Sequence, residues 1–158
     1  MDKLAVSLLP HSTFAGWSGA CTGTGICVVT LNGDKSVTAT FNPPLALDGS
    51  WSGTTSSDRV VGFTVVNNTI TSITLGFLYS DTSGVCTVEV TNPNPIGIQN
   101  NTFAFNISAS GLSTSVTGRF TSSTQMTGTY GNLTWNNFRC GSGLINATTL
   151  AGSYFARR

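Results

Sequence analysis

Four cysteines are the residues of this chain whose chemistry depends most directly on their spacing. They form a close pair, Cys21 and Cys27, and a distant pair, Cys86 and Cys140. An even number of cysteines in a chain rich in Thr, Asn and Gly predicts two disulfides and an oxidising compartment. Zinc binding is the competing interpretation, but zinc favours tighter Cys-x-x-Cys pairs or histidine ligands, and the sequence has one histidine, His11. We therefore predict disulfides and no metal.

Each predicted disulfide has a structural interpretation. Cys21 and Cys27 close a short loop of Gly and Thr, and no flanking cation is present to lower a thiol pKa for redox catalysis. Cys86 and Cys140 close a long loop between two predicted strands. In the chain-entropy account such a bridge contributes about 4 kcal/mol to stability.

The titratable residues do not form a recognisable catalytic set. A glycosidase or an aspartic protease needs a close pair of carboxylates, whereas the six acids here are dispersed along the sequence. They are Asp2, Asp34, Asp48, Asp58, Asp81 and Glu89. No Gly-x-Ser-x-Gly nucleophile elbow occurs. We predict no catalytic residue and no cofactor, and we interpret Asp58 and Asp81 as turn carboxylates rather than calcium ligands. A hydrolase whose site forms only on folding is retained as a third class of function.

Aromatic side chains offer a different chemistry, the stacking of sugar rings. Trp17, Trp51, Trp135 and Tyr130 are the candidate ligand-binding residues, provided that several of them reach one exposed face. The alternative is that each packs in the core or across strands, as most aromatic residues of β folds do. We favour packing.

Charge is scarce in this sequence. Charged residues make up 8% of the chain, and the net charge is +1. Attraction to nucleic acid or to an anionic membrane needs clustered cations, whereas Arg157 and Arg158 are the only adjacent basic pair. No apolar run is long enough to span a bilayer. These features argue against a nucleic-acid partner and against membrane insertion, and they leave a protein partner, self-association or a glycan.

The elements that must position these residues are β-strands, because β-branched residues are frequent and helix formers are few. Alternation at residues 4–8 predicts a first strand. A hairpin is predicted where residues 26–31 and 37–41 flank Asn32-Gly33, since this dipeptide favours the positive φ of tight hairpin turns.

Pro43-Pro44 marks the best boundary in the chain, because proline donates no backbone hydrogen bond to a strand ladder. It separates a module at 1–42 from a domain at 45–158. In this domain, turn residues recur at the short intervals typical of a β-sandwich or barrel. The predicted strands lie at about 49–55, 60–66, 70–79, 85–91, 102–108, 115–121, 125–133 and 138–147. Residues 148–156 are a last strand or a docking tail.

Two of these strands supply most of the predicted core. Their alternating apolar side chains are Val61, Phe63 and Val65 in one strand and Ile73, Leu75 and Phe77 in the other. Burial of one such side chain stabilises a fold by about 1.5 to 3 kcal/mol, so these rows outweigh any single polar contact.

Residues 12–27 read Ser-Thr-Phe-Ala-Gly-Trp-Ser-Gly-Ala-Cys-Thr-Gly-Thr-Gly-Ile-Cys, and residues 34–41 read Asp-Lys-Ser-Val-Thr-Ala-Thr-Phe. This pattern closely resembles the C-terminal half of the divergent internalin-type B-repeat, which occurs in bacterial surface and secreted proteins. Members of that family have a further β-hairpin before the strand that corresponds to residues 4–8, and this sequence lacks it. Either the chain is cut inside a repeat, or the half-repeat offers an unpaired strand edge to a partner.

The domain at 45–158 includes Gly-Ser-Trp-Ser-Gly-Thr-Thr at 49–55, Thr-Gly-Thr-Tyr at 127–130 and Cys-Gly-Ser-Gly at 140–143. These segments resemble an uncharacterised β domain of bacterial secreted proteins. The resemblance implies a secreted β fold and no assigned activity.

The sequence thus predicts an all-β protein, with an antiparallel β-sandwich or barrel domain preceded by a partial internalin-type B-repeat module. We expect a non-catalytic, extracellular or cell-surface bacterial protein that acts in adhesion or assembly, as a filament or oligomer subunit joined by β-strand pairing. The alternative function is that of a carbohydrate-binding accessory module of a larger secreted enzyme.

Overall fold

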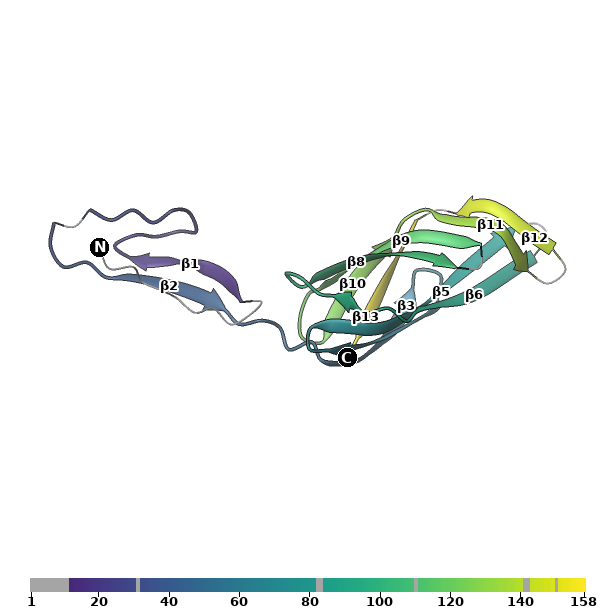
Figure 1. Cartoon of the computed structure of the whole chain (residues 1–158), viewed down its shortest axis with the longest axis horizontal. Helices are drawn as coiled ribbons and strands as arrows, with labels where there is room; N and C mark the ends of the chain where they lie inside the picture. The colour runs from purple at the N-terminus through teal and green to yellow at the C-terminus, as the bar shows by residue number, and fades with distance from the viewer. Residues whose placement is uncertain (1–11, 31, 82–83, 110, 141–142, 150) are drawn as a thin grey trace. The chain divides into compact units, whose positions relative to one another are not determined.

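The computed structural model describes residues 12–158 apart from 31, 82–83, 110, 141–142 and 150 (Figure 1). Within these residues the chain is built of antiparallel β-strands, which confirms the predicted all-β class. It divides into two compact units, Met1–Leu45 and Ala46–Arg158, which we call unit 1 and unit 2. The described part of the chain contains no helix that could cross a membrane. The predicted strand at residues 4–8 lies outside the described residues.

Unit 1 contains a two-stranded sheet of β1 (Thr13–Gly19) and β2 (Val37–Asn42). The prediction of a hairpin between residues 26–31 and 37–41 is wrong, because β2 pairs with β1 instead. The local Asn32-Gly33 signal is overridden, since every residue of β2 has its pairing partner in β1.

The backbone N–H of Trp17 donates to the Gly23 carbonyl at 2.8 Å and ties this loop to β1. None of the described residues pairs as a strand with residues 24–30. The alternating apolar side chains of this segment consequently have no core to face, and Ile26 and Val28 are 96% and 81% exposed.

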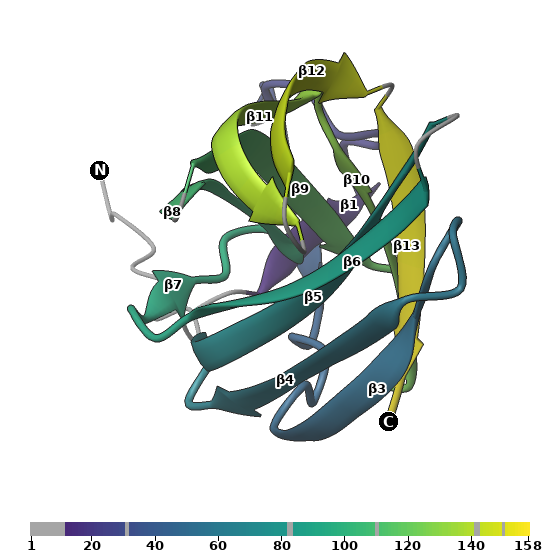
Figure 2. The ribbon, with the colours of Figure 1, turned by 90° about the vertical axis from the view of Figure 1, so that its right-hand side faces the viewer.

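Unit 2 is a continuous antiparallel sheet of 11 strands that curves into two facing layers (Figure 2). The first layer holds β3 (Gly49–Thr55), β4 (Val60–Val66), β5 (Thr69–Asp81), β6 (Gly84–Asn92) and β7 (Ile96–Gly97). The second holds β8 (Thr102–Ala109), β9 (Leu112–Phe120), β10 (Gln125–Tyr130), β11 (Leu133–Cys140) and β12 (Gly143–Thr149). The last strand, β13 (Gly152–Arg157), pairs with β10 and with β3 and so joins the layers.

The arrangement is sandwich-like, and the barrel alternative of the prediction is not realised. Among the described residues the strand order ends at β6, which pairs with no strand but β5, and at β12, which pairs with no strand but β11. The curved sheet therefore ends without pairing to itself, and no closed barrel forms.

The predicted strand pattern fails at 125–147, where three strands take the place of two. The chain turns after Tyr130, and the turn is held because the Gly131 N–H donates to the Ser115 carbonyl at 2.7 Å. The Thr114 hydroxyl also donates to the Gly131 carbonyl, at 3.1 Å. Residues 148–156, left open between a strand and a docking tail, include most of β13, which lies inside the sheet.

Both predicted core rows are confirmed, since all six of their side chains are buried. Aromatic rings join the layers: Trp51 of β3 lies 4.9 Å from Phe120 of β9 between ring centroids, and Phe77 of β5 lies 5.3 Å from Tyr130 of β10. All buried hydrophobic side chains of the described residues belong to unit 2. At about 1.5 to 3 kcal/mol for each large side chain, unit 2 has a core of its own.

Candidate functional site

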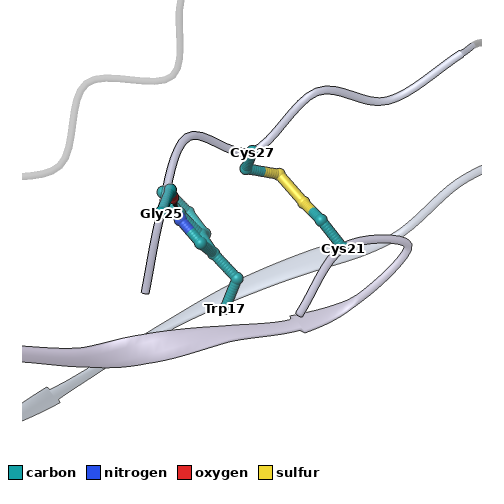
Figure 3. Close-up of a disulfide and its surroundings, with 4 residues drawn as sticks. All are labelled: Trp17, Cys21, Gly25 and Cys27. Atoms are coloured by element: carbon teal, nitrogen blue, oxygen red, sulfur yellow. Dashed lines mark hydrogen bonds between the residues drawn. A yellow bond between two sulfur atoms is a disulfide. The ribbon is translucent and has the colours of Figure 1, made fainter. Parts of the chain in front are cut away.

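The short disulfide shapes the loop of unit 1 (Figure 3). Cys21 is bonded to Cys27, as predicted. The indole N–H of Trp17 donates to the Gly25 carbonyl at 2.9 Å, and the Trp17 ring packs against Phe14 with 5.0 Å between centroids. Trp17 is half-buried and holds the disulfide loop against β1.

Unit 1 has no fully buried side chain among its described residues. Its aromatic cluster of Phe14, Trp17 and Phe41 is only half-buried. Ile26 and Val28 add apolar surface that is almost wholly exposed.

Among the described residues, one edge of this small sheet has no strand partner. Gly23 occupies part of the outer side of β1, whereas β2 pairs with β1 alone within the described residues. The β2 strand reads Val-Thr-Ala-Thr-Phe-Asn and contains neither charge nor proline. Natural edge strands usually carry charged residues, proline or bulges that prevent further pairing. The β2 strand thus lacks charge and proline, and the one irregularity of the β1–β2 pair lies in β1, between Phe14 and Gly16.

The long disulfide clamps the two layers of unit 2. Cys86 of β6 is bonded to Cys140 of β11, as predicted. These strands lie in opposite layers and are not neighbours in the sheet. Tyr79, the pairing partner of Cys86, contacts the Trp135 ring of the opposite layer at 5.7 Å between centroids. The two disulfides together indicate a non-reducing compartment.

Three of the four aromatic residues considered for ligand binding lie in the core. Trp51, Trp135 and Tyr130 are 2%, 0% and 7% exposed, so they offer no ring face to a sugar. Each of these rings instead contacts an aromatic ring of the opposite layer: Trp51 contacts Phe120, Tyr130 contacts Phe77 and Trp135 contacts Tyr79. This is the packing alternative favoured above. The structure therefore does not bring these candidates together on an exposed face.

Two of the described acids, Asp48 and Asp58, lie at turns, whereas Glu89 lies within β6. The Asp48 carboxylate accepts backbone N–H bonds from Asn67 and Asn68, at 3.1 and 3.4 Å, and so holds the turn between β4 and β5. Asp58 lies in the turn before β4 with a φ of 53°. Among the residues that the structure describes, no group of three or more His, Cys, Asp or Glu is placed to hold a metal ion. Asp2, His11 and the side chain of Asp81 lie outside the described residues.

A hollow on the outer face of unit 2 is lined by side chains of several strands, and we call it the trough. Its volume is about 1150 Å³, and it extends over β8, β9, β10, β13 and β3. Strand register aligns its outward side chains in two rows, because residues two apart on a strand share a face. The hydroxyl row is named for Thr117, Thr129 and Ser153, and Ala104 stands at its end. The Phe155 row consists of Thr102, Arg119, Thr127, Phe155 and Thr54.

Most side chains of the two rows are exposed. The Thr117 and Thr129 hydroxyls lie 3.0 Å apart and form a hydrogen bond across the strands. Phe155 is 46% exposed, and the Arg157 guanidinium carbon lies 5.9 Å from its ring centroid. The trough thus presents hydroxyl groups and one aromatic ring to solvent.

The inner side of the same strands is tightly packed. Gly118 and Gly128 are paired, and the rings of Phe103 and Tyr154 fill the space that side chains at these glycines would need. The Tyr154 hydroxyl donates to the Thr117 carbonyl at 2.9 Å. Burial raises the pKa of Tyr154 well above its ordinary value, so this donor keeps its proton. The trough is therefore backed by a well-packed sheet.

Sequence reasoning missed the trough residues. Phe155 lies in residues 148–156, which the sequence analysis interpreted as either a last strand or a docking tail. Arg119 belongs to no motif recognised in the sequence. The available signal was the Thr-x-Thr spacing of Thr127 and Thr129, which places two hydroxyls on one face of a strand. Comparison with protein-family models, with curated proteins and with solved structures finds no match to this chain.

Proposed function

We propose that the chain is a non-catalytic extracellular module of a bacterial surface that acts in adhesion or assembly. It self-associates by pairing the β2 edge of unit 1 with the same edge of a second copy. The observation that supports this proposal most strongly comes from the described residues of unit 1. There the uncharged β2 strand pairs with β1 alone, and no side chain is fully buried.

Energetics favour such pairing. A two-stranded sheet is only marginally stable by itself in water, and more strands or a packing partner are needed for independent stability. Pairing β2 with a second β2 satisfies the free N–H and C=O groups of both edges. It also extends the sheet, which gives the half-buried Phe14 and Phe41 more apolar surface to contact.

The location rests on separate observations. Both disulfides favour a non-reducing compartment, and the extracellular space of a bacterium is one. The resemblance of residues 12–27 and 34–41 to the internalin-type B-repeat supports the cell surface in particular. The lack of clustered cations agrees with a protein partner rather than nucleic acid.

Two matched pairs of substitutions test the proposal. Thr38→Lys with Thr40→Lys adds two cations to exposed positions of β2, where they face the same cations of the second copy. Thr22→Lys with Thr24→Lys adds the same charge to exposed positions of the disulfide loop, outside both strands. Sedimentation velocity over a range of concentrations measures the association of the native chain and of both variants.

We expect the native chain and the Thr22/Thr24 variant to associate with the same concentration dependence, and the Thr38/Thr40 variant to remain monomeric. A native chain that stays monomeric at every concentration contradicts the proposal. Equal association of the two variants contradicts it as well, because the interface would then lie elsewhere.

A further inference from the structure

The trough of unit 2 points to a binding site that is independent of the β2 edge. We propose that it binds a neutral polysaccharide, which lies along the Phe155 row and crosses the five strands. Three properties of the trough support this ligand class: the chemistry of its lining, its charge and its dimensions.

The lining combines hydroxyl groups with one exposed ring. Thr and Ser hydroxyls both donate and accept hydrogen bonds, as sugar hydroxyls do. Thr127, at the centre of the Phe155 row, lies between Arg119 and Phe155 on the neighbouring strands. The exposed Phe155 ring supplies an apolar surface for the C–H face of a pyranose, and an aromatic ring contributes large contact area at low conformational cost.

The charge of the trough favours a neutral ligand. Arg119 and Asp58 are its two ionisable lining residues apart from tyrosine, and their charges are opposite. A polyanion needs several clustered cations, and the trough lining provides one. Hydrolysis of a glycosidic bond needs two carboxyl groups, whereas one lines the trough. The arrangement therefore suits binding without cleavage.

The dimensions suit a chain rather than a single sugar. Neighbouring strands lie about 4.8 Å apart, so five strands carry the Phe155 row over roughly 19 Å. The spacing between strands is close to the length of one pyranose unit, so that successive sugars meet successive strands. The cavity of about 1150 Å³ also exceeds the volume of roughly 300 to 1,000 Å³ that is usual for small-molecule sites.

Affinity electrophoresis of the full chain tests the proposal. Native gels contain xylan, galactomannan, mixed-linkage β-glucan or hydroxyethyl cellulose as neutral probes, and polygalacturonate as an acidic probe. Phe155→Ala removes the ring, and Thr127→Val removes one hydroxyl with little change in shape. Val85→Ala is the matched control, because Val85 is 65% exposed on β6 and does not line the trough. Circular dichroism confirms that each variant is folded.

We expect at least one neutral polysaccharide to retard the native chain and the Val85→Ala variant equally. Phe155→Ala and Thr127→Val should each weaken that binding by about tenfold. The proposal is overturned if no neutral polysaccharide retards the native chain, if only polygalacturonate does, or if both trough variants bind like the native chain. The Thr38/Thr40 variant should bind the polysaccharide normally, which separates this result from the test of strand pairing.

Discussion

Removal of the long disulfide tests how the two layers of unit 2 are held together. Cys86 lies on β6, an edge strand whose pairing within the described residues is to β5 alone, and Cys140 lies on β11 of the opposite layer. The perturbation is the double substitution Cys86→Ala with Cys140→Ala, which avoids leaving a free thiol. Without the bridge, β6 is held to the opposite layer by side-chain packing alone.

The expected loss of stability follows from the length of the closed loop. The two cysteines are separated by 54 residues, for which the chain-entropy relation predicts about 4 kcal/mol. Domains are typically stable by about 5–15 kcal/mol, so this is a large fraction of the free energy of unfolding. For a unit of this size it corresponds to a fall in melting temperature of roughly 10–20 °C.

Differential scanning calorimetry of the native chain and the variant measures this fall. Cys21→Ala with Cys27→Ala is the control, because that disulfide belongs to unit 1 and should leave the melting of unit 2 unchanged. Reduction of the native chain should reproduce the effect of the double substitution at Cys86 and Cys140. If the Cys86/Cys140 variant melts within about 3 °C of the native chain, the disulfide does not hold the layers together, since packing alone is then sufficient.

Two further predictions concern the packed inner side of the trough. Gly128→Ala places a Cβ atom 2.2 Å from the Tyr154 ring, and we expect urea titration to show that the free energy of unfolding falls by about 1–3 kcal/mol. Gly62→Ala is the control and should be tolerated, because nothing lies within 4 Å of its Cβ atom. Equal effects of the two substitutions would contradict the tight packing at Gly128. Tyr154→Phe removes the hydrogen bond to Thr117 and should cost about 1 kcal/mol at neutral pH. Because the pKa of Tyr154 is raised on folding, the stability of the native chain should fall as pH rises above about 10. A Tyr154→Phe chain that shows the same fall would disprove that Tyr154 causes it.

Alternating hydrophobicity was sufficient to predict the central strands. Val61, Phe63 and Val65 share one face of a strand whatever its neighbours are, and any layered sheet buries that face. The disulfides could likewise be predicted from the even number and spacing of the cysteines. These features depend on short stretches of chain, which is why sequence alone reveals them.

The trough and the joining of the two layers by the Cys86–Cys140 disulfide depend instead on which strands become neighbours. Thr127 and Phe155 meet only because β10 pairs with β13 in a particular register. Before that register is known, outward threonines look like any solvated strand face. Local signals can also be overridden, since β2 pairs with β1 and, among the described residues, no hairpin forms at Asn32-Gly33. The burial of Trp51 and Trp135 follows from the same long-range arrangement.

Hydrogen exchange at the β2 strand tests the central claim of strand pairing most directly. The amide N–H groups on the open edge of β2 become protected only if a further strand pairs with them. Mass spectrometry of the peptide that covers β2 is expected to show slow exchange at concentrations where the native chain associates. Exchange should be fast in dilute solution and in the Thr38→Lys, Thr40→Lys variant at every concentration. Exchange that is equally fast in associated native chains would show that the β2 edge is not the interface.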